Sequence, residues 1–152
     1  MRQTVDREAV FGLLARVRLQ HDNVERLTQL LSDYDMSNIS EENVTVALRQ
    51  NYSGVSNGFL ADLYEAICGV SVEVAGDPVP LFVCPCCGFR TLTELHDPEK
   101  GTGYDVCDHC GWEDDGTTDE TVVSSVNHTS MAELRSKMRT ESNYYERTKW
   151  LR

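Results

Sequence analysis

The apolar positions near the start of the chain recur at the spacing of an amphipathic helix. Ala9, Val10, Leu13, Leu14 and Val17 lie three and four residues apart, so their side chains share one face of a helical turn. A charged or polar residue interrupts every apolar stretch here, as expected for a helix with one solvated side. The pattern predicts a first helix from about Val5 to Leu19.

Two more helices are predicted from their starting residues. Asp22 followed three residues later by Glu25 is typical of a capped helix start, and leucines at helical spacing continue the pattern to Leu31. Ser40 is placed to cap a third, shorter helix, which ends near Asn51. The residues between these helices are polar and predict loops.

A fourth helix precedes the first predicted strand. Ser56 or Asn57 caps this helix, and Gly69 lies where a left-handed terminating residue belongs. Cys68, in the final turn, is predicted to face the core. Apolar and polar side chains then alternate over residues 70–74, which predicts a strand with one buried face.

The end of the chain has a weaker pattern. Residues 121–126 predict a strand, and Ser130 with Glu133 predicts a capping box ahead of a helix through Leu134 and Met138. Helices that precede short strands indicate the α+β class.

Composition and charge narrow the classes of partner. No apolar run approaches the roughly 20 residues that span a bilayer, so we expect a cytoplasmic protein that is neither secreted nor membrane-bound. The formal net charge is -11, and residues 91–120 contain ten acidic residues against Lys100 alone. Nucleic-acid binding requires clustered lysine and arginine, so the charge favours a basic protein partner instead.

Two cysteine motifs share one plan. CPCCGF at 84–89 and CDHCGW at 107–112 each give Cys, two residues, Cys, Gly and an aromatic. Two cysteines at this spacing can direct both sulfur atoms to one metal ion, and cytosolic cysteine clusters are more often metal ligands than disulfides. We predict that Cys84, Cys87, Cys107 and Cys110 bind one structural Zn²⁺ per chain.

The residues between the two motifs are predicted to form a strand, a turn around residues 98–103 and a returning strand, which together make a zinc ribbon. Four thiolates leave no open coordination position, so no catalysis is expected at the metal. Unliganded core thiols and a redox pair are the weaker interpretations of these cysteines. Cys86 is interpreted as a surface thiol or a bystander, although it could replace Cys87 as a ligand.

The predicted organisation has three parts that pack as one compact unit. Residues 1–76 form a helical N-terminal region, residues 77–126 form the zinc-ribbon lobe, and residues 127–152 form a C-terminal helix and tail. The tail from Arg135 is the one basic stretch of the chain, and its cations are expected to balance acidic groups within the molecule.

An aromatic residue beside consecutive acids follows the second cysteine motif. Such a combination can supply desolvated contact area and fast electrostatic capture of a cationic protein. A solvated acidic loop with Trp112 packed on the ribbon is the alternative. The predicted partner-binding residues are Trp112, Glu113, Asp114, Asp115, Asp119 and Glu120.

The strings CPCCGFRTL, GTGYDVCDHCGWEDDG and SSVNHTSMAEL together resemble the bacterial cysteine-rich CPCC family. The resemblance implies a small metal-binding protein without enzymatic activity, and some relatives look like toxin immunity proteins. Neutralisation of a basic toxin domain is therefore the preferred function. A zinc-ribbon module for nucleic acids or transcription is one alternative. A hydrolase or transferase that uses His96, His109 or His128 with nearby acids is the other.

Overall fold

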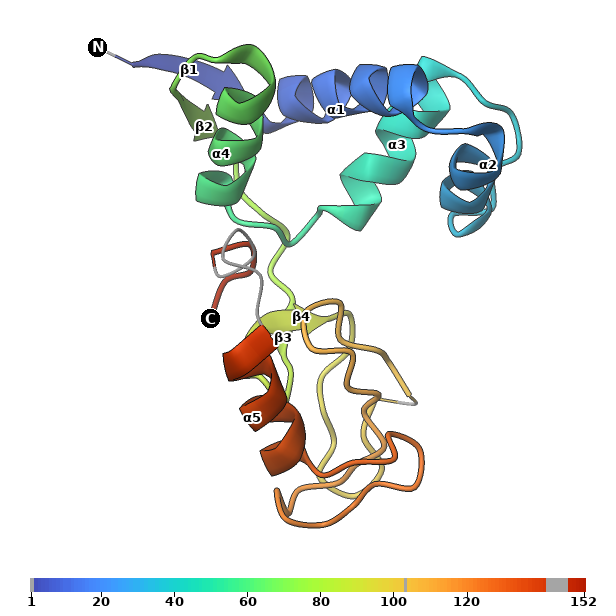
Figure 1. Ribbon diagram of the computed structural model, residues 1–152, viewed down its shortest axis with the longest axis vertical. Helices are drawn as coiled ribbons and strands as arrows, with labels where there is room; N and C mark the ends of the chain where they lie inside the picture. Colours follow the sequence, from blue (N-terminus) through green and yellow to red (C-terminus); the bar gives the residue numbers. More distant parts are fainter. Residues whose placement is uncertain (1, 103, 142–147) are drawn as a thin grey trace. The chain divides into compact units, whose positions relative to one another are not determined.

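The computed structural model describes residues 2–102, 104–141 and 148–152 (Figure 1). The chain divides into two compact units, Met1–Pro78 (unit 1) and Val79–Arg152 (unit 2). Its described residues form five helices and two pairs of short strands, which confirms the predicted α+β class. No described helix is both long and apolar enough to cross a membrane.

Unit 1 contains a two-stranded parallel sheet and four helices. Val5 and Asp6, predicted as the start of a helix, instead belong to a strand over residues 3–6, which pairs with the second strand in parallel, from Gln3 opposite Val72 to Asp6 opposite Ala75. Asp6 then caps the helix, because its side chain accepts a hydrogen bond from the amide of Glu8 at 2.9 Å. The elements are β1 (Gln3–Asp6), α1 (Arg7–His21), α2 (Val24–Ser32), α3 (Glu41–Asn51), α4 (Asn57–Cys68) and β2 (Val72–Ala75).

The helix starts of unit 1 follow the predicted capping chemistry with one change. Ser40 and Ser56 accept hydrogen bonds from backbone amides three residues on, as predicted. The cap of α2 is Asn23 rather than Asp22, whose carboxylate pairs with Arg18. Gly69 ends α4 in the left-handed conformation, with φ of 71°.

Apolar side chains of α1, α2 and α3 form one hydrophobic core cluster of unit 1. Its buried members come from one face of each helix, as the helical spacing predicts. These are Ala15, Leu27, Leu30, Leu31, Val44, Ala47 and Leu48. Unit 1 also buries one charged side chain, Arg7, whose guanidinium donates to the carbonyl of Val55 at 2.8 Å and to Asn57 at 2.6 Å.

Unit 2 has little regular structure outside one helix. Strands β3 (Phe82–Val83) and β4 (Arg90–Leu92) pair antiparallel, and α5 spans Met131–Glu141. The predicted capping box is confirmed in part, because Ser130 accepts from the amide of Glu133 at 3.2 Å. Residues 142–147, with Arg147 of the predicted basic tail, and Gly103 of the predicted turn lie outside the described residues.

Two predicted strands of unit 2 are absent from its described residues. Residues 121–126 form turns, with a single bridge between Ser124 and Thr129, because local turn bonds take up the backbone groups that a strand would use. The return strand between the cysteine motifs is reduced to one bridge, from Val106 to Glu113. The antiparallel pair β3–β4 flanks the first motif instead of joining the two motifs.

Candidate metal centre

The two cysteine motifs fold into loops with the same backbone hydrogen bonds. In the first, the amide of Cys84 donates to the carbonyl of Phe89 at 2.8 Å and Gly88 donates back to Cys84 at 3.0 Å. In the second, Cys107 donates to Trp112 at 2.9 Å and Gly111 donates to Cys107 at 2.8 Å. Each loop therefore reverses the chain immediately after its second cysteine.

Glycine occupies the position that this reversal requires. Gly88 and Gly111 have φ of 78° and 76°, a region that other residues enter at a cost of about 1–2 kcal/mol. The CxxCG spacing that the two motifs share therefore accounts for their two equivalent loops.

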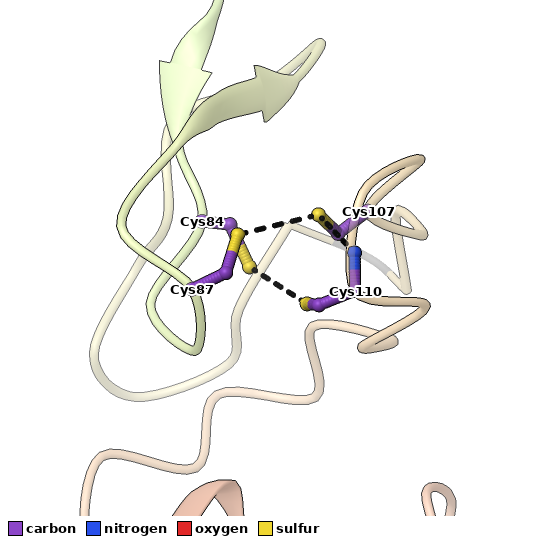
Figure 2. Close-up of side chains that lie close together, drawn as sticks. All are labelled: Cys84, Cys87, Cys107 and Cys110. Atoms are coloured by element: carbon purple, nitrogen blue, oxygen red, sulfur yellow. Dashed lines mark hydrogen bonds between the residues drawn. The ribbon is translucent and has the colours of Figure 1, made fainter. Parts of the chain in front are cut away.

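The loops bring four sulfur atoms together from opposite sides (Figure 2). Cys84 Sγ lies 3.7 Å from Cys110 Sγ, Cys87 Sγ lies 3.7 Å from Cys107 Sγ, and all four atoms lie within 4.8 Å of one another. Four thiolates at about 2.3 Å from a tetrahedral zinc ion would be about 3.8 Å apart. The donor set therefore fits a four-coordinate thiophilic metal ion.

The polar groups around the cluster favour thiolate at Cys107. Its sulfur accepts from the amides of His109 and Cys110, each at 3.3 Å, and lies 2.9 Å from the hydroxyl of Thr91. The pKa of Cys107 is lowered, first by hydrogen bonds from the thiols of Cys110, Cys84 and Cys87 and then by the Cys110 amide. A negative charge is thus already stabilised where a cation would bind.

The pKa values of Cys84 and Cys110 shift in the opposite direction. The pKa of Cys110 is raised, first by its hydrogen bond to Cys107, and the pKa of Cys84 is raised for the same reason. Thiolates this close repel one another, so protons or a metal cation must occupy the space between them. A divalent ion would neutralise the negative charge that, without a metal, is concentrated on the sulfur of Cys107.

Cys86 and Cys68 lie outside this cluster, and both differ from their predicted environments. Cys86 is buried, not a surface thiol, and its sulfur donates to the carbonyl of Met131 at 3.9 Å. Cys68 is exposed, because the last turn of α4 lies on the surface of unit 1, so its assignment to the core was wrong.

Arg135 of α5 supports the first cysteine loop from outside. Its guanidinium donates to the carbonyls of Pro85, at 3.0 Å, and Cys86, and to the carboxylate of Glu120 at 2.6 Å. The sequence pattern placed Arg135 only in a basic tail. No spacing rule links residues about 50 positions apart, so its role could not be derived from the sequence.

Trp112 and Asp114, two of the predicted partner-binding residues, are buried with 0% exposure. Trp112 packs in a core of unit 2 with Leu92, Met131 and three of the cysteines. His96 Nδ1 lies 2.8 Å from both carboxylate oxygens of Asp114. Trp112 and Asp114 therefore lie inside unit 2, and neither side chain offers surface to a partner.

The other four predicted partner-binding residues keep some exposure. Asp119 and Glu120 are exposed, and Glu113 and Asp115 are half-buried. Burial tends to raise the pKa of Asp115, but hydrogen bonds from Thr117 and Ser124 outweigh it, so the pKa is lowered overall. The carboxylate of Asp115 is thus engaged in hydrogen bonds within its own loop region.

The fold and the site define a protein that joins a helical unit to a four-cysteine metal-binding module. Residues 82–146 match the family model described as cysteine-rich CPCC, as the sequence motifs predicted. No curated protein and no solved structure matches the chain. The matched segment contains all four cysteines of the cluster.

Proposed function

We propose that the four cysteines bind one structural Zn²⁺ and that the chain is a non-catalytic module that binds a basic protein. The spacing of the four sulfur atoms is the observation that carries the metal assignment. Zinc favours a closed tetrahedral set of thiolates and adds no redox chemistry. Since such a set leaves no position for water or substrate, the metal would stabilise unit 2 and catalyse nothing.

The acidic side chains support a basic partner. Nine of the ten acids in residues 91–120 keep exposed or half-buried side chains, so the field of this segment is strongly negative despite the burial of Asp114. A negative surface attracts a cationic protein and repels nucleic acid. Its exposed members are Glu94, Glu99, Asp108, Asp119 and Glu120.

The narrower form of the proposal is that this partner is a bacterial toxin domain, which the chain neutralises. Its support is the resemblance to CPCC relatives that look like immunity proteins, together with the charge. A cationic enzyme that acts on nucleic acids or nucleotides would be attracted to such a surface, and a metal-stapled lobe is rigid before binding.

The catalytic alternative has one structural feature to recommend it, the pair of His96 and Asp114. A histidine oriented by a buried carboxylate is a common part of hydrolytic sites. The hydrogen bonds described for His96 lead only to Asp114, and the hydroxyl of Ser124 donates to Asp115 at 2.7 Å, so the described contacts give this histidine no nucleophile. We therefore interpret the pair as a link between two loops.

Metal content and spectroscopy test the zinc assignment. We expect one zinc ion per chain, and replacement by Co²⁺ should give the intense visible bands of tetrahedral thiolate coordination. Cys86→Ser should retain the metal and the bands, whereas Cys107→Ser should lose both. Full metal binding by Cys107→Ser would refute the four-cysteine site.

The partner is tested by two variants of equal net charge. Glu94→Gln, Glu99→Gln and Asp108→Asn together remove three exposed acids from unit 2, while Glu25→Gln, Glu42→Gln and Glu65→Gln remove three from unit 1. The basic protein that co-purifies with the wild-type chain would be titrated against both by calorimetry. The unit 2 variant should bind at least tenfold more weakly at low salt. Equal losses would show that only net charge matters, and no loss would refute an acidic interface.

A further inference from the structure

Strand β1 has one paired edge and one open edge. It pairs with β2 alone among the described strands, and Figure 1 shows the two strands beside α4. An open edge presents backbone amide and carbonyl groups that a further strand can pair with. A two-stranded sheet is also small for a stable sheet, so an added strand would complete it.

A hollow of about 470 Å³ follows this strand. All four residues of β1 line it, together with Ala9 and Leu13 of α1. Side chains of consecutive strand residues point to opposite faces, so a hollow that touches all four runs along the strand rather than over one face. The hollow therefore provides space beside the backbone of β1.

The residues of β1, together with Arg2 directly before the strand, are self-complementary. Arg2, Thr4 and Asp6 are exposed and alternate along the chain, so they share the exposed face. In an antiparallel pair of two such strands centred on Thr4, Arg2 of each strand faces Asp6 of the other and the two threonines face each other. Opposite charges and threonine pairs are among the favourable cross-strand neighbours.

We propose that β1 pairs antiparallel with β1 of a second copy of this chain, which creates a four-stranded sheet across a two-fold axis. The symmetry is closed, because the same surface serves both copies. α1 begins directly after Asp6, so the two copies of α1 leave the strand pair at opposite ends. The contact is short, and we expect a weak dimer that forms with rising concentration.

Sedimentation velocity over a concentration series of the zinc-loaded chain tests the dimer. Arg2→Glu places two acids opposite Asp6 residues and should weaken dimerisation about tenfold, whereas Arg2→Lys should dimerise like wild type. A chain that stays monomeric up to millimolar concentration would overturn the proposal and leave the edge to a strand of another protein. Equal dimerisation of Arg2→Glu and Arg2→Lys would overturn this register.

Site-directed crosslinking tests the register directly. Across an antiparallel pair, opposite Cα atoms lie about 4.5–5.5 Å apart, which is within disulfide range. Thr4→Cys in a Cys68→Ser background should therefore form a covalent dimer under mild oxidation. Glu73→Cys is the matched control, because Glu73 is an exposed strand residue on β2. If it crosslinks as fast as Thr4→Cys, the pairing is refuted.

Discussion

The two units of this chain reach a folded state by different means. Unit 1 buries leucine, valine and alanine from three helices, whereas the main buried cluster of unit 2 contains three cysteines beside Leu92, Trp112 and Met131. Hydrophobic burial alone can stabilise the first arrangement. The second surrounds four sulfur atoms that cannot all be thiolates without a cation between them, so we expect metal to be part of the stability of unit 2 only.

The loops of unit 2 show the same dependence on polar groups. Asp97 and Asp119 each accept a hydrogen bond from an amide two residues on, at 2.8 and 2.9 Å, as in Asx turns. Asp105 accepts from both the amide and the hydroxyl of Thr93, at 2.7 and 2.9 Å. Hydrogen bonds to acidic side chains therefore help to hold the loops of unit 2 in place, whereas unit 1 is held mainly by the packing of its helices.

Removal of the metal should produce the largest difference between the units. Structural zinc sites contribute on the order of 10 kcal/mol to folding, so chelation should unfold unit 2 while unit 1 stays folded. Both tryptophans of the chain, Trp112 and Trp150, lie in unit 2, so tryptophan fluorescence reports unit 2 alone. Far-UV circular dichroism mostly reports unit 1, which contains four of the five described helices.

Cys107→Ser provides the genetic version of this experiment, with Cys68→Ser as its matched control. Cys68 is exposed on unit 1, so its replacement should leave both signals unchanged. Unchanged tryptophan fluorescence in metal-free protein or in Cys107→Ser would contradict a structural role for the metal.

Truncation of one buried side chain in each unit should give the next largest effect. Trp112→Ala should destabilise unit 2 by about 3–5 kcal/mol, and Leu48→Ala should destabilise unit 1 by about 2–5 kcal/mol. Trp112 packs in the same cluster as the cysteines, so its truncation should also weaken zinc binding. Urea unfolding with competitive chelator titration measures both. Equal zinc affinity in the two variants would show that the packing of Trp112 does not contribute to zinc binding.

The sequence predicted the features that depend on neighbouring residues. Helix caps such as Ser40 and Ser130 follow from local hydrogen bonding, and the pairing of cysteines follows from the two-residue spacing within each loop. β1 was missed because its parallel partner, β2, begins nearly 70 residues later and no local pattern links the two. The strand is also short and ends directly before α1, so its apolar residue, Val5, fits the helical spacing of the residues that follow.

The burial of Asp114, the middle acid of the acidic run, could not be predicted from the sequence. A Trp followed by three acids is usually a solvated segment, but here the amide of Asp114 bonds to the carbonyl of Asp105 at 2.9 Å. This bond and the contact with His96 bring the middle acid of the run inside. The contributing loops are separated in sequence, so only the tertiary structure decides which acid is enclosed.

Two glycines of unit 2 test how tightly these loops pack. Gly101 and Gly88 both have positive φ, but a Cβ at Gly101 would lie 2.4 Å from the carbonyl oxygen of Asp114, whereas a Cβ at Gly88 meets nothing within 4 Å. Gly101→Ala should therefore destabilise unit 2 by about 2–4 kcal/mol and Gly88→Ala by about 1–2 kcal/mol. Urea unfolding followed by tryptophan fluorescence gives both values. If the two variants are equal, the close approach of the loops is not a packing constraint.

The smallest expected effect concerns the bond between α5 and the first cysteine loop. Arg135→Gln removes donors to the carbonyls of Pro85 and Cys86 and should destabilise unit 2 by about 1–3 kcal/mol. Lys137→Gln removes the same charge from a more exposed position on α5 and should change stability by less than about 0.5 kcal/mol. Zinc affinity separates positioning from general stability, because Arg135 contacts the loop that carries Cys84 and Cys87. A tenfold or greater loss of affinity in Arg135→Gln alone would show that α5 positions the metal ligands, and equal affinity in both variants would show that α5 only packs against them.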